Sequence, residues 1–106
     1  MAEKFTAVYV MVRQSELTPE DGGRYDKPLA LQKEMCLRFV KEKGLEGSMP
    51  VRVYTSRGEL LKDIERDEVA RLVVESIDRL GSNPGEVDAV LYEMKERQVD
   101  VHQVSA

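Results

Sequence analysis

A short, strongly apolar run from Val69 to Ile77 limits the architectures open to this sequence. β-Branched and aliphatic residues dominate the run, and it is too short for a typical helix. Such a run is typical of a strand buried on both faces of a parallel sheet. Asp78 and Arg79 follow directly. We therefore expect both at the carboxyl edge of the sheet, where open α/β folds place their functional sites.

Strand-like and helix-like segments alternate along the whole chain. This alternation favours a parallel sheet with right-handed crossovers. The predicted fold class is α/β, a small three-layer domain around a central, mainly parallel four-stranded sheet. Strands are expected at Phe5–Val12, Val51–Tyr54, Val69–Ile77 and Val99–Val104. Helices are expected from Pro28 to about Gly44, at Leu60–Ile64 and over residues 84–97.

Apolar side chains recur at helical spacing in both long helices. The second long helix begins with Asn83-Pro84, a capping residue followed by a proline that a first turn tolerates. His102 lies in the last strand, which we expect to be an outer strand, so its side chain is expected to face solvent. The residues that recur at helical spacing are Leu29, Gln32, Met35, Cys36, Phe39 and Val40 in the first long helix, and Val87, Val90, Leu91 and Met94 on one face of the second.

Composition indicates one globular domain spanning residues 1–106, with 42% hydrophobic and 34% charged residues. No apolar run approaches the ~20 residues that a membrane span needs. The single Cys36 allows no internal disulfide and suits a reducing cytoplasm. With one cysteine and one histidine, we expect neither a metal site nor a cofactor. The net charge of −4 argues against nucleic-acid binding through the overall field.

Four short motifs occur in an order that resembles the catalytic domain of serine recombinases, the resolvase and invertase family. The resemblance covers nearly the whole chain and implies the resolvase-like version of the predicted fold. The motifs are Y-V-M-V-R at residues 9–13, Leu29 with Gln32, R-G-E-L at residues 57–60, and D-R-L-G-S at residues 78–82.

The resemblance implies a catalytic site from which the nucleophile is missing. In the family, a serine hydroxyl attacks DNA phosphate while several arginines neutralise its charge. Arg57 and Arg79 match two of those arginines, and Asp78 lies beside them. Arg13, however, stands where the nucleophile should be, and a guanidinium group cannot attack phosphorus. Met11 and Ser82 stand where two further arginines are expected.

Several roles remain open for these residues. Ser15 would share a side with Arg13 if the first strand continued, and could then act as a nucleophile, although a loop position is the favoured interpretation. Arg13, Ser56, Arg57 and Arg79 could form an anion or DNA-phosphate site. They could equally be structural. Arg79 would then pair with a neighbouring carboxylate, Arg13 with Asp78, and Ser56 would form a polar turn before a helix.

The leading functional prediction is a resolvase-like domain that no longer cleaves DNA and acts as an interaction or regulatory module. It would self-associate or dock through helix 84–97 and an exposed edge strand. The family's long dimerisation helix and helix-turn-helix domain have no counterpart in these 106 residues. One alternative is an active or vestigial DNA recombinase using Ser15. Another is a phosphate- or nucleotide-binding flavodoxin-like domain, although Gly22-Gly23 does not form a glycine-rich phosphate loop.

Overall fold

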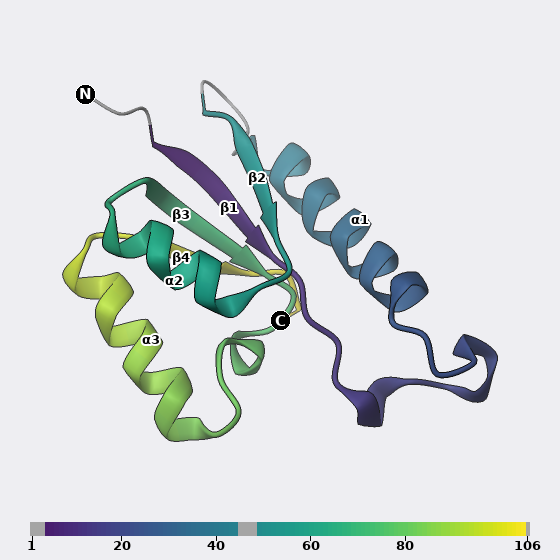
Figure 1. The fold of residues 1–106 in the computed structure, drawn as a ribbon. Coiled ribbons are helices and arrows are strands. Elements are labelled where there is room, and N and C mark those ends of the chain that lie inside the picture. Colours follow the sequence, from purple (N-terminus) through teal and green to yellow (C-terminus); the bar gives the residue numbers. More distant parts are fainter. Residues whose placement is uncertain (1–3, 45–48, 106) are drawn as a thin grey trace.

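A parallel four-stranded sheet runs through the centre of the structure (Figure 1). The structure is a computed structural model that describes residues 4–44 and 49–105. The strand order is β2-β1-β3-β4, and all three neighbouring pairs are parallel. The strands are β1 Phe5–Tyr9, β2 Val51–Tyr54, β3 Val69–Val74 and β4 Asp100–Gln103. The helices are α1 Asp26–Glu42, α2 Arg57–Glu65 and α3 Pro84–Glu96, with 3₁₀ turns η1 Gln14–Glu16, η2 Pro19–Asp21 and η3 Ile77–Leu80.

Helix α1 lies on one face of the sheet, and α2 and α3 lie on the other, so the predicted three-layer α/β fold is confirmed (Figure 1). The larger core lies between the sheet and the pair α2 and α3, where Leu60, Leu72 and Met94 are fully buried. The smaller core lies under α1 and includes Cys36. Burial raises the pKa of the Cys36 thiol to about 11, as expected for a small apolar core residue.

Local capping explains where the helices begin. Ser56 precedes α2 and accepts a hydrogen bond from the Glu59 backbone at 3.3 Å, so α2 begins at Arg57 rather than at Leu60. Asn83 caps α3 as predicted. Helix α1 begins two residues before Pro28, because a proline is tolerated within the first helical turn.

Strands β1 and β3 are each three residues shorter than predicted. β1 ends at Tyr9 rather than Val12, and β3 ends at Val74 rather than Ile77. Beyond these ends, side chains replace the strand ladder as backbone partners. Gln32 holds the backbone of Met11, and the Gln103 amide accepts from the Ile77 backbone at 2.8 Å. Asp78 and Arg79 consequently lie in η3, not at the tip of a strand.

One prediction about exposure was wrong. His102, which we expected to face solvent, is half-buried, with its ring 6.3 Å from that of Phe39. Met35 is 45% exposed. The apolar stripe of α3 is covered by the sheet, where Val90 and Met94 are buried. Among the described helices, none combines the length and apolar content that a membrane span requires.

Candidate functional site at the carboxyl edge of the sheet

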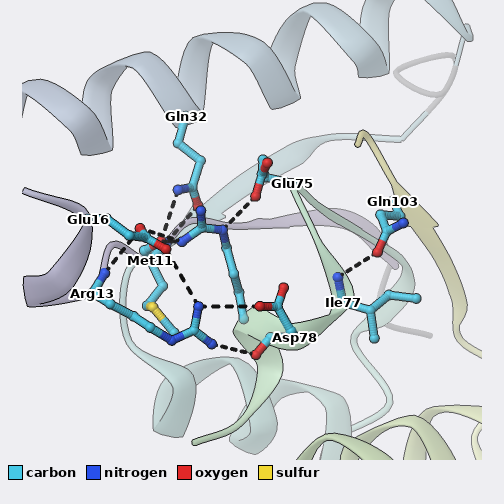
Figure 2. A network of polar contacts seen from close by, with 9 residues as sticks. Met11, Arg13, Glu16, Gln32, Glu75, Ile77, Asp78 and Gln103 are labelled. Atoms are coloured by element: carbon cyan, nitrogen blue, oxygen red, sulfur yellow. Dashed lines mark hydrogen bonds and ion pairs between the residues drawn. The ribbon is translucent and has the colours of Figure 1, made fainter. Parts of the chain in front are cut away.

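The segments that follow β1 and β3 meet at the carboxyl edge of the sheet, because the two strands are parallel neighbours with Tyr9 paired to Val74. Arg13 and Asp78 therefore come together although 65 positions separate them. Figure 2 shows their side chains facing each other across this edge. The Arg13 Nη2 donates to the Asp78 carbonyl at 2.7 Å, and Nη1 to its carboxylate at 3.4 Å. Of the two roles predicted for Arg13, the salt bridge to Asp78 is present.

Arg79 is held by the protein on three sides. Its Nε donates to Glu75 at 2.6 Å, and its Nη1 donates to the Met11 carbonyl at 2.6 Å and to Glu16 at 2.9 Å. The side chain is only 13% exposed. Burial lowers the pKa of Arg79, but its hydrogen bonds with Glu16 and Glu75 outweigh that effect and raise the pKa overall. The charged guanidinium group thus connects η1 with the segments that follow β1 and β3.

Glu16 joins the two arginines. Its carboxylate lies 2.9 Å from the Arg79 Nη1 and 3.6 Å from the Arg13 Nη1, and it also accepts from the Arg13 backbone at 3.2 Å. Burial raises the pKa of Glu16. The hydrogen bonds from Arg79 and from the Arg13 backbone lower this pKa by more than burial raises it, so the net shift is downward. Glu16 therefore remains ionised between two cations.

A neutral side chain fixes the same loop to α1. The buried Gln32 amide accepts from the Met11 backbone N–H at 2.8 Å and donates to the Met11 carbonyl at 2.9 Å, as Figure 2 shows. This pair of bonds mimics the contacts of a neighbouring strand. It positions the Met11 carbonyl, which Arg79 also contacts.

Arg57 is the first residue of α2, and its side chain contacts η3. Its Nε donates to the Leu80 carbonyl at 2.6 Å, and its side chain lines a hollow of about 210 Å³ between α2 and α3. Glu65 and Glu93 line the same hollow. Burial raises the pKa of Tyr9, and the nearby Arg57 and Arg13 guanidinium groups only partly offset that rise. No hydrogen bond within the described residues joins Arg57 to the cluster around Arg79.

Neither candidate serine hydroxyl forms a hydrogen bond with Arg13, Arg57 or Arg79 of the described residues. Ser15 lies in η1 and is exposed, because β1 ends at Tyr9 and the strand does not continue to it. The Ser15 hydroxyl forms no hydrogen bond with a described residue. The Ser56 hydroxyl is used to cap α2.

The charge balance of this edge does not favour a phosphate. Arg13 and Arg79 face three carboxylates, from Glu16, Glu75 and Asp78. A phosphate would have to displace charge-assisted hydrogen bonds that are already made. A hollow of about 350 Å³ beside Arg13 is lined by the further acid Asp88 and by Ile77, Pro84 and Val87. Within residues 4–44 and 49–105, no group of three or more His, Cys, Asp or Glu side chains could hold a metal ion.

Glu16 and Glu75 are the residues of this cluster that the sequence motifs did not identify. Both carry a local signal. Glu75 lies four positions before Arg79, and Glu16 three positions after Arg13, spacings that allow side chains to pair within a turn. The contact between Glu16 and Arg79 has no such signal, because it depends on how β1 and β3 pair.

No protein-family model matches this sequence, and the comparison with curated proteins also gives no match. Solved structures do match. The C-terminal catalytic domain of ISC1926 TnpA, an IS607-like serine recombinase, superposes with a TM-score of 0.70 at 15% identity, over 95% of this chain and 67% of that one. A serine recombinase from Sulfolobus solfataricus gives 0.63 at 16% identity, over 97% and 69%. The N-terminal catalytic domain of TP901-1 integrase gives 0.61 at 16%, over 95% and 77%. The chain therefore has the fold of a serine recombinase catalytic domain.

Proposed function

We propose that this domain keeps the recombinase fold but does not cleave DNA, and that it acts as an interaction or regulatory module. The observation that carries the proposal is the state of Arg79. Its guanidinium group is engaged by Glu75, Glu16 and the Met11 carbonyl instead of being free for a phosphate. Catalysis of phosphoryl transfer depends on cations preorganised for the developing charge.

The position of the nucleophile supports the same proposal. Arg13 stands where the family motif has its serine, and its side chain is tied to Asp78. Ser15, the alternative nucleophile, is exposed in η1. An active or vestigial recombinase would need Ser15 to approach Arg57 and Arg79, which make separate contacts with the protein.

A phosphate-binding flavodoxin-like function is the weaker alternative. Gly22 and Gly23 have positive φ angles of 59° and 76° and form a turn after η2, not a loop that leads from β1 straight into α1. A backbone phosphate cradle needs that direct connection from strand to helix N-terminus.

The proposal is tested by trapping covalent protein–DNA adducts on supercoiled plasmid DNA. An active serine recombinase serves as the positive control. We expect no adduct with the wild-type chain and no difference from Ser15→Ala, because no activated hydroxyl faces a cation cluster. Ser82→Ala, which removes an exposed hydroxyl near the same edge, is the matched control. An adduct that forms with wild type and Ser82→Ala but not with Ser15→Ala would overturn the proposal.

Oligonucleotide titration over a range of salt tests the remaining anion-site role. Binding through phosphates weakens steeply as salt rises. We expect the wild-type chain to show no salt-dependent oligonucleotide binding that is lost in the Arg79→Ala variant. Binding with such a dependence would instead support a DNA-contacting domain.

A further inference from the structure

The exposed large apolar side chains of the described residues lie on two opposite sides of the molecule. Leu31 is 57% exposed and Met35 45% exposed on α1, with Tyr25 just before that helix, and Tyr92 is 65% exposed on α3. Helices α1 and α3 cover opposite faces of the sheet (Figure 1). Exposed apolar groups gathered on one element commonly mark a binding surface.

The surface on α1, which we call the α1 face, comprises Lys27, Pro28, Leu31, Met35 and Arg38. Pro28, Leu31 and Met35 lie one turn apart along the helix, and Lys27 and Arg38 flank them. All but the half-buried Pro28 are exposed.

A hollow of about 190 Å³ lies beside the α1 face. One wall is apolar, from Val12 together with the three apolar residues of the α1 face, and the other is polar, from Glu16, Gln32, Glu75 and Arg79. An occupant that suits both walls has an apolar body and a hydrogen-bonding tip, which describes a tyrosine side chain.

The surface on α3, which we call the α3 face, comprises Asp88, Tyr92 and Glu96. These residues are four positions apart, so they form one stripe along the helix with the tyrosine in the middle. All three are exposed. The α3 face is therefore an aromatic ring between two carboxylates. The α1 face is an apolar patch between two cations, of which Arg38 also forms an exposed ion pair with Glu34 at 3.2 Å.

We propose that the α3 face of one copy docks on the α1 face of a second copy of this chain. Tyr92 enters the hollow, its ring against Leu31 and Met35 and its hydroxyl toward the polar wall. Asp88 and Glu96 lie near Lys27 and Arg38. The occupant is a second copy because this chain presents both halves of the match, and because α1 and α3 lie on opposite faces of the sheet and cannot meet within one molecule.

The contact is heterologous, since two different surfaces meet. Each copy keeps one unused face, so association continues into a ring or an open filament. The surface is small, and contacts below about 1,200 Å² are typically weak and transient. We therefore expect association at concentrations of roughly 10 µM to 1 mM.

Sedimentation velocity on two complementary variants tests this arrangement. Leu31→Asp disables the α1 face and Tyr92→Asp disables the α3 face, and each change is at an exposed position. We expect each variant alone to associate at least about tenfold more weakly than wild type. An equimolar mixture should form a heterodimer and stop there, because each variant retains the face that the other lacks. Lys62→Asp, an exposed position on α2 outside both faces, is the control.

Three results would overturn the inference. Wild type could stay monomeric to about 1 mM, a single variant could associate as well as wild type, or the mixture could form no heterodimer. Equal association of Tyr92→Asp would instead indicate an α1-to-α1 contact. Circular dichroism and thermal melting verify that the variants are folded. The inference rests on the proposed interaction function, but its failure is distinguishable, because the adduct assay tests loss of cleavage without reference to association.

Discussion

Arg79 is a cation at the edge of the sheet whose hydrogen bonds are made with the chain's own groups. The side chain is mostly buried and touches two carboxylates and one carbonyl. The contacts come from three segments, which follow β1, form η1 and follow β3. Removing the guanidinium group would leave the half-buried Glu75 carboxylate without this donor, and would take one donor each from Glu16 and the Met11 carbonyl. Leaving a partly buried polar group unsatisfied costs more than the net value of the bond itself.

We therefore predict that Arg79→Met lowers the free energy of unfolding by roughly 1–3 kcal/mol. Urea denaturation followed by circular dichroism measures the change. Arg66→Met is the matched control, because Arg66 is exposed and forms no side-chain ion pair or hydrogen bond with a described residue. Equal stability of the two variants would show that the Arg79 cluster does not stabilise the fold.

Glu16 predicts a pH dependence of stability. Its pKa in the folded protein lies below its ordinary value, because Arg79 and the Arg13 backbone hold the ionised form. Its contribution is therefore complete above the unfolded-state pKa and is lost as the pH falls through the lower, folded-state pKa. Glu16→Gln should be less stable than wild type at pH 7, and this difference should shrink as the pH falls below about 4. Urea denaturation from pH 3 to pH 7 measures it. A difference that is constant across this range would contradict the assignment.

At the scale of elements, close approach of η3 and α3 depends on Gly81. A Cβ atom at this position would lie 2.6 Å from the Glu86 Cβ and 2.9 Å from the Val87 backbone nitrogen. The Gly81 φ of −162° suits any residue, so the requirement is one of space. Because backbone atoms of α3 form part of the obstacle, the helix must shift to accept even a methyl group.

We predict that Gly81→Ala destabilises the fold by about 1–3 kcal/mol, the usual cost of overpacking. Gly58→Ala is the control. At Gly58 the nearest atom to an added Cβ is the Ser56 hydroxyl at 3.9 Å, so alanine should be neutral or should stabilise α2 by up to ~1 kcal/mol. Thermal melting of both variants measures the contrast. A tolerated Gly81→Ala would mean that α3 can move without loss of packing.

The sequence was enough to predict the kind and order of the elements, because hydrophobic periodicity and capping residues are local signals. Asn83-Pro84 is such a signal, and α3 begins there. The predicted ends of β1 and β3 were wrong, because the actual ends depend on side chains from distant segments. The Gln32 side chain accepts a hydrogen bond from the backbone of Met11, and the Gln103 side chain accepts one from the backbone of Ile77. No local pattern reveals which distant residue, on a helix or a strand, will supply such a partner.

The candidate site was predictable only in part for the same reason. The pairing of Arg13 with Asp78 follows from placing two strand ends side by side, and it was among the roles considered from the sequence. The different hydrogen-bond partners of Arg57 and Arg79 were not predictable, because the motifs place both residues at the sheet edge without showing which contacts each makes.

At the scale of the whole molecule, a shared fold does not imply a shared chemistry. The chain superposes on serine recombinase catalytic domains at 15–16% identity, which shows a shared architecture. Under the proposed function, the internally neutralised sheet edge binds no phosphate, and the outer faces of α1 and α3 are the surfaces that carry function. An architecture alone does not fix an activity.

The central claim, that the chain's own carboxylates neutralise the arginines of this edge, is tested most directly by NMR. The Nε–Hε resonances of Arg13, Arg57 and Arg79 are followed while inorganic phosphate is added. We predict no saturable shift in the wild-type chain, and saturable shifts of Arg79 in a Glu16→Gln, Glu75→Gln double variant, in which the guanidinium group is released. Saturable shifts of Arg57 and Arg79 together in the wild-type chain would reveal an intact phosphate site and contradict the account.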